Sequence, residues 1–168
     1  SFCIQALLQA LYHRAKTGEG QYLDMAMTEI FSTLIPEAVA DYDMNNREPE
    51  RVGNMDRIKA PHDLFACKGY QKWVAISISN DAQWHSLCNV IGRPDLLDDA
   101  RFTNIELRWR HQNEFPDIIE QWTTSLDPKD AAEALQKAGV PAGPVLNSGE
   151  ILIDGHLLER GFITQIDH

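Results

Sequence analysis

The first residues of the chain place apolar side chains three and four positions apart, which is the spacing of one helix face. This pattern predicts a helix over 3–16, and Gly18 follows where a left-handed residue commonly ends a helix. No start signal precedes the pattern, so we expect the sequence to continue upstream of Ser1. The apolar positions of this face are Phe2, Cys3, Ile4, Leu7, Leu8 and Leu11.

Three further segments complete the first third of the chain. Apolar bulk over 21–27 predicts a strand, and 29–44 has a helical pattern. Pro36 falls inside that pattern and predicts a kink or break, because proline cannot continue the backbone hydrogen bonding of a helix. The polar stretch over 45–55 predicts a linker and is the best candidate for a domain boundary.

The remainder of the chain predicts one α+β core over 60–140. Residues 64–67 and 73–78 alternate around Lys68–Gln71 as the two strands of a β-hairpin do. Polar caps, prolines and glycines then delimit helices over 80–91, 94–99, 104–125 and 127–139, an extended segment over 140–146, short helices near 151 and 157, and a strand over 162–166. The expected buried residues are Phe65, Trp73, Val74, Ile76, Trp84, Leu87, Ile91 and Trp122.

Composition excludes several classes of function. The chain of 168 residues carries a net charge of -10, which opposes non-specific binding to nucleic acid. No apolar run reaches the ~20 residues that span a bilayer, so we expect no membrane partner. Cys3, Cys67 and Cys88 are widely spaced among apolar residues, which predicts free buried thiols and a reducing, cytoplasmic location.

Catalytic motifs are absent from the sequence. The six histidines never pair at the spacing of metal ligands, so we expect no metal site; they are His13, His62, His85, His111, His156 and His168. Gly18–Gly20 follows a helix and precedes a predicted strand, the reverse of the order in dinucleotide-binding loops. Arg108–Arg110 contains two basic residues around a tryptophan and is interpreted as one face of a helix.

One polar loop, over 53–61, is the exception. It lies between a linker and a strand, and loops on a rigid scaffold often line binding sites. A plain surface loop remains the alternative on the residues alone. Arg57 and Lys59 could meet an anionic group, and the candidate site residues are Gly53, Asn54, Asp56, Arg57 and Lys59.

The order of short motifs along the whole chain resembles the family III CoA-transferases (CaiB/BaiF-like), the group of formyl-CoA transferase and the carnitine CoA-transferases. No single motif is decisive, and the resemblance rests on the collinear set. The matching residues are Ala10-Leu11, Arg14, Thr17-Gly18, Gly20-Gln21, Asp24, Gly53-Asn54, Ala60-Pro61-His62, Gly69, Asn80–Trp84, Leu87, Ile91–Pro94, Leu97, Asp99, Arg101-Phe102, Arg108, Ala138–Val145 and Arg160-Gly161.

The resemblance implies a fold and a domain plan. Such enzymes are interlocked homodimers with a Rossmann-like large domain built from both chain ends and a small α+β domain between linkers. The parts expected here are the end of the large domain's first half over 1–27, a linker helix and active-site loop over 28–59, the small domain over 60–140 and a return linker over 141–168.

The resemblance also implies the chemistry. The family nucleophile is an aspartate just before the opening helix, so we expect it upstream of Ser1, with no catalytic residue in this chain and no activity of this piece alone. It reacts with an acyl-CoA and passes through an aspartyl-CoA thioester before a carboxylic acid accepts the CoA. Coenzyme A thioester is therefore expected as substrate, with no bound cofactor. Where formyl-CoA transferase has a run of glycines over its active site, this chain has Asp56–Lys59, which suggests a bulkier or anionic acyl substrate.

Two alternatives belong to other classes. The α-methylacyl-CoA racemases share the fold and move a proton instead of an acyl group, but their helix opens with a glutamate where this chain has Asn80–Trp84. A non-catalytic acyl-CoA-binding or interaction module is the other alternative. An aspartate upstream of Ser1 favours the transferase, and its absence favours a binding protein.

Overall fold

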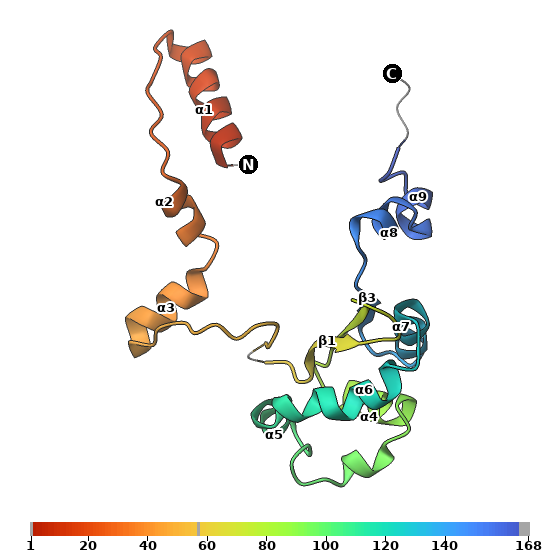
Figure 1. The fold of residues 1–168 in the computed structure, drawn as a ribbon. Helices are drawn as coiled ribbons and strands as arrows, with labels where there is room; N and C mark the ends of the chain where they lie inside the picture. Colours follow the sequence, from red (N-terminus) through yellow and green to blue (C-terminus); the bar gives the residue numbers. More distant parts are fainter. Residues whose placement is uncertain (1, 57, 165–168) are drawn as a thin grey trace. The chain divides into compact units, whose positions relative to one another are not determined.

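The computed structural model describes residues 2–56 and 58–164. The chain divides into two compact units, Ser1–Arg51 and Val52–His168. Figure 1 shows the helices of the first unit and the small sheet with its helices in the second. No described helix combines the length and the apolar composition that a membrane span requires. Each unit is described by itself below.

The first unit contains three helices, α1 (Phe2–Thr17), α2 (Met27–Ser32) and α3 (Pro36–Asn45). Helix α1 ends where Gly18 adopts a positive φ of 79°, as predicted. The break at Pro36 is confirmed, because the proline is the first residue of α3. The strand expected over 21–27 does not form: residues 21–26 are irregular and Met27 begins α2. A strand needs a hydrogen-bonded neighbour, and the described residues of this unit contain no other strand.

A three-stranded antiparallel sheet forms the centre of the second unit, in the order β1 (His62–Ala66), β2 (Trp73–Ser77) and β3 (Ala142–Pro144). The hairpin is confirmed, with Phe65 opposite Val74 in the register. The third strand lies within the segment that the sequence predicted only as extended. It joins the sheet because Val74 and Ala75 on β2 are paired with Pro144 and Gly143.

Helices α6 (Phe115–Thr123) and α7 (Pro128–Lys137) pack against the sheet (Figure 1). Helix α6 contacts β1, and α7 contacts β2 and β3. Helix α4 (Asp81–Val90) packs against α7 and against the short 3-10 helix η1 (Pro94–Leu97). The helix expected over 104–125 is divided into α5 (Ile105–Arg110), the 3-10 helix η2 (Gln112–Glu114) and α6. Two short helices, α8 (Ser148–Leu152) and α9 (Gly155–Glu159), follow β3.

The core of the second unit agrees with most of the sequence prediction. Trp73 and Trp122 are only half-buried. Of the three cysteines, Cys67 and Cys88 are buried as expected, whereas Cys3 is exposed, because α1 has no buried residue. The predicted core residues that are confirmed as buried are Phe65, Val74, Ile76, Trp84, Leu87 and Ile91.

The end of the described chain corrects one further expectation. Phe162 and Ile163 form a bend and not a strand, and the rest of the expected strand, residues 165–166, lies outside the described residues. A capping box at Asn147 and Glu150 starts α8, and Glu150 is also paired with Lys72. The lysine holds the pKa of the Glu150 carboxyl below its usual range.

Candidate functional site

The polar loop over 53–59 is tied to the first strand of the sheet at its beginning. Gly53 adopts a positive φ of 63°, which a residue with a side chain adopts at a cost. The Nδ2 of Asn54 donates to Oδ1 of Asp63 (3.0 Å), and the Nδ1 of His62 donates to the Asn54 carbonyl (2.6 Å). Because a carbonyl oxygen can only accept a hydrogen bond, this contact requires a proton on Nδ1 of His62.

The second half of the loop is tied to α5. The indole Nε1 of Trp109 donates to the Asp56 carbonyl (3.0 Å), and Oδ1 of Asp56 accepts from the backbone N–H of Ile58 (2.8 Å). The loop ends at Ala60, whose N–H donates to the Ile78 carbonyl (3.1 Å). The carbonyl of Ala60 accepts from Nε of Arg108 (3.3 Å).

Arg108 is fully buried, with 0% of its side chain exposed. Its three nitrogens donate to the carbonyls of Ala60 and Phe102 (3.0 Å) and to Oδ1 of Asp81 (2.6 Å). The guanidinium also lies over the ring of Trp84, 5.4 Å from its centroid. The planar fork of arginine can serve three acceptors at once, so one side chain joins the loop end, the chain before α5 and the start of α4.

A cavity of about 590 Å³ lies between this loop and the sheet. Its polar groups are Asn54, His62, Asp63 and Ser77, and the register places His62 directly opposite Ser77. Pockets for small molecules are typically apolar with a few such polar groups. The lining residues are Gly53, Asn54, Met55, His62, Asp63, Leu64, Ala75, Ile76, Ser77, Pro141, Ala142 and Gly143.

The structure brings together part of the predicted site. Gly53 and Asn54 line the cavity, and Asp56 is half-buried beside it through its contact with Trp109. Lys59 is half-buried, does not line the cavity and forms no ion pair with a described residue. Arg57 lies outside the described residues.

Sequence reasoning missed three residues that shape this region. His62 and Arg108 belong to the motif set that carried the family resemblance, but neither was given a role. Trp109 was interpreted as part of a helix face, although its indole holds the loop. No local signal in the sequence would have found this bond, because it goes to a backbone carbonyl 53 positions away.

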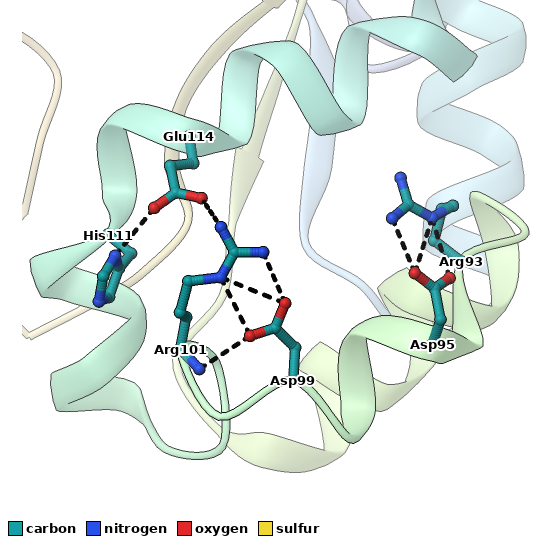
Figure 2. Close-up of polar contacts among 6 residues, drawn as sticks. All are labelled: Arg93, Asp95, Asp99, Arg101, His111 and Glu114. Atoms are coloured by element: carbon teal, nitrogen blue, oxygen red, sulfur yellow. Dashed lines mark hydrogen bonds and ion pairs between the residues drawn. The ribbon is translucent and has the colours of Figure 1, made fainter.

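A second group of charged residues lies elsewhere in the same unit (Figure 2). Arg101 forms ion pairs with Asp99 and Glu114, and Glu114 accepts from Nδ1 of His111 (2.8 Å). The hydrogen bonds from Arg101 lower the pKa of Asp99 to about 2. None of these four residues lines the cavity, so this cluster joins the chain after η1 to η2 without taking part in the site.

The two buried thiols are poor candidates for nucleophiles. Burial raises the pKa of Cys67, and it raises the pKa of Cys88 to about 12. A thiolate is the reactive form of cysteine, and both groups stay protonated near neutral pH. Among the described residues, no group of three or more histidine, cysteine, aspartate or glutamate side chains is arranged to hold a metal ion.

Comparison with known proteins identifies the class to which this fold and loop belong. The model of CoA-transferase family III matches residues 1–168, and the chain therefore belongs to this family. A CaiB/BaiF family protein from Brucella suis has a similar structure, with a TM-score of 0.84 and 28% sequence identity, over 95% of this chain and 42% of that protein. The mixed helical fold with a small three-stranded sheet is thus the fold of this family.

Two sequence relatives carry specific names. The chain is 33% identical to the succinyl-CoA:mesaconate CoA-transferase of Haloarcula marismortui, over 96% of this chain and 39% of the relative. It is also 33% identical to the succinyl-CoA–L-malate CoA-transferase beta subunit of Chloroflexus aurantiacus, over 98% and 40%. The chain therefore spans about two fifths of the length of these relatives.

Proposed function

We propose that the full-length protein transfers CoA from an acyl-CoA to a carboxylic acid, and that this chain supplies the small domain and a loop beside the acyl group. The observation that carries the proposal is the family match over residues 1–168, which includes the loop and the cavity. The relatives named above act on succinyl-CoA and a second dicarboxylic acid. A dicarboxylic acid is accordingly the substrate class that we propose.

The proposed chemistry uses an aspartate outside this chain. Its carboxylate attacks the thioester carbonyl of the acyl-CoA, which forms a mixed anhydride and releases the CoA thiolate. The thiolate then attacks the aspartyl carbonyl, so that aspartyl-CoA thioester forms and the first acid leaves as carboxylate. The acceptor carboxylate repeats these two steps in reverse and leaves as the new acyl-CoA. Each covalent step replaces one acyl bond by another, so no net proton or electron is required.

The residues of this chain bind and orient in this proposal. The cavity between residues 53–55 and the sheet receives the acyl part of the substrate, and His62 and Ser77 offer polar contacts to its oxygen atoms. Lys59, which forms no ion pair with a described residue, adds positive charge within the loop. The full-length protein works as an interlocked homodimer in this proposal.

The decisive experiment uses full-length protein with succinyl-CoA and a panel of dicarboxylic acids. Formation of the new acyl-CoA is followed by chromatography, and the protein is examined by mass spectrometry for covalently bound CoA. Exchange that disappears when the upstream aspartate is replaced by asparagine supports the proposal. The 168-residue chain alone is the matched control and is expected to show no exchange. Deuterium incorporation at Cα of a 2-methylacyl-CoA without any acyl exchange would contradict it and indicate a racemase.

A further inference from the structure

Two polar residues face the cavity from neighbouring strands of the sheet. Side chains alternate between the two faces of a sheet, and the buried Phe65, Val74 and Ile76 define the core face. His62 and Ser77 belong to the opposite face, where the register pairs them directly, and both line the cavity. Side chains of directly paired residues on antiparallel strands lie about 5 Å apart, so one small group can reach both.

The rest of this face is small or apolar. Leu64 is paired with Ala75, Ala75 is also paired with Gly143 on β3, and all three residues line the cavity. The cavity therefore offers an apolar stretch beside one polar pair. A short hydrocarbon chain is compatible with the apolar stretch, whereas a charged group on that chain requires hydrogen-bond partners when it leaves water.

One ring nitrogen of His62 is engaged and the other is not. Nδ1 donates to the Asn54 carbonyl (2.6 Å), while Nε2 forms no hydrogen bond with a described residue. The backbone N–H of Ser77 donates to the Pro141 carbonyl (3.0 Å), while its hydroxyl likewise has no partner among the described residues. A histidine that is protonated on both nitrogens donates from both, so the bond from Nδ1 is compatible with a second bond from Nε2 to a ligand.

The charges along the cavity wall favour an anion at His62. Among the described lining residues, only His62 can become a cation, and Asp63 is the other ionisable group. Oδ1 of Asp63 accepts from Nδ2 of Asn54 (3.0 Å) and from the backbone N–H of Leu64 (2.7 Å). These two N–H groups offset part of the negative charge of Asp63, whereas the free Nε2 of His62 has no such partner. His62 is thus the group on this wall that a carboxylate would bind.

We propose that His62 and Ser77 bind the second carboxylate of a dicarboxylic acyl group, and that His62 determines the specificity of this cavity. The inference rests on the proposed function, in which the cavity receives the acyl part of the substrate. Nε2 of His62 and the Ser77 hydroxyl each donate to a carboxylate oxygen, while the carbon chain lies over Ala75 and Gly143. A monocarboxylic acyl group ends in a methyl group instead and leaves both donors without an acceptor, which weakens its binding.

Isothermal titration calorimetry of the full-length protein tests the inference with succinyl-CoA and butyryl-CoA. These ligands have acyl chains of the same length, and only succinyl-CoA has a terminal carboxylate. The measured quantity is the ratio of the two dissociation constants. His62→Asn keeps an amide N–H near the place of Nδ1 and lacks Nε2, whereas the longer side chain of His62→Gln reaches the place of Nε2. His85→Asn makes the first change at an exposed position of α4 that does not line the cavity, and it is the matched control.

We expect the unmodified protein to bind succinyl-CoA more tightly than butyryl-CoA. This preference should fall about thirtyfold in His62→Asn, which corresponds to about 2 kcal/mol since 1.4 kcal/mol is tenfold, the size of a hydrogen bond to a charged group. It should fall about fivefold in Ser77→Ala, about threefold in His62→Gln, and not at all in His85→Asn.

Equal affinities in the unmodified protein, or an undiminished preference in His62→Asn, would overturn the role of His62. A preference lost in His62→Gln and kept in His62→Asn would assign the effect to the bond with Asn54 and would also overturn it. If His62→Asn does not fold, Ser77→Ala decides in its place, because an undiminished preference in that variant contradicts the paired site.

A transfer assay with the same two acyl-CoA ligands separates this inference from the proposed function. CoA transfer together with a preference that depends on His62 supports both. CoA transfer with a preference that does not depend on His62 overturns the recognition site alone. A preference in binding that depends on His62, without any transfer, leaves the recognition site in place and overturns the proposed transferase activity.

Discussion

The two ends of the ion pair between Arg108 and Asp81 are expected to differ sharply in their contribution to stability. The arginine side chain is 0% exposed, whereas the side chain of Asp81 is 66% exposed. Replacing Arg108 by alanine leaves the carbonyls of Ala60 and Phe102 without their donor and opens a gap beside Trp84. An unpaired buried polar group costs about 1–3 kcal/mol, so we expect Arg108→Ala to lower the free energy of unfolding by about 3–5 kcal/mol.

The loss of stability in Asp81→Asn is expected to be smaller than in Arg108→Ala. The amide oxygen can still accept from the guanidinium, but the buried charge of Arg108 loses its carboxylate, so we expect the free energy of unfolding to fall by about 2 kcal/mol. Arg108→Lys distinguishes charge from geometry. Lysine keeps the charge, but its single ammonium cannot span the three acceptors of the planar fork, and we expect a loss of about 2 kcal/mol.

Urea denaturation of the 168-residue chain measures these differences. All four tryptophans lie in the unit Val52–His168, so their fluorescence reports on the unit that contains the ion pair. The slope of unfolding free energy against urea should stay constant across the variants, which shows that the same surface unfolds. The reasoning would be refuted if Asp81→Asn cost as much as Arg108→Ala, or if Arg108→Lys matched the unmodified protein.

Three further outcomes follow from the described contacts. Arg101 lowers the pKa of Asp99 to about 2. The stabilisation that the ionised Asp99 provides is therefore present above pH ~4 and is lost as the pH falls to about 2. The urea midpoint of Asp99→Asn should fall less on acidification than the midpoint of the unmodified protein. Gly139 has a φ of 78°, and Gly139→Ala should destabilise by about 1 kcal/mol in the same assay, unlike Gly143→Ala. By circular dichroism, residues 52–168 alone should melt cooperatively, whereas a cooperative transition of residues 1–51 alone would contradict the finding that no described residue of that unit is buried.

Helix starts in the second unit were predictable because the signal is local. Asn80, Asn104 and Asp127 each accept from a backbone N–H two or three residues ahead, as an N-cap does. The buried face of the hairpin was also predictable, since Phe65 on one strand and Val74 and Ile76 on the other alternate with more polar neighbours. Each cap lies within three residues of the N–H that it accepts from, and the two strands of the hairpin are neighbours in the sequence.

The anchors of the candidate loop could not be read in this way. The bond from Trp109 to Asp56 and the bond from Arg108 to Ala60 use backbone carbonyls, which carry no residue identity. The type of the residue at position 56 or 60 therefore does not indicate that a side-chain donor binds its backbone carbonyl. The sequence could propose the loop from its polarity and position, while its conformation depends on a helix some fifty residues away.

The first unit shows a different limit of sequence patterning. The apolar spacing of α1 predicted its helix, yet no residue over 2–51 is buried, and Ile4 and Leu8 are 66% and 60% exposed. An isolated helix of this length is marginal in water, and most helices in proteins are stabilised by packing of their apolar face. Periodicity therefore reports that a face is built for burial without saying what covers it. Among the described residues of this unit, nothing buries the apolar face of α1. In the second unit, by contrast, the apolar face of α7 is buried and the helix contacts β2 and β3.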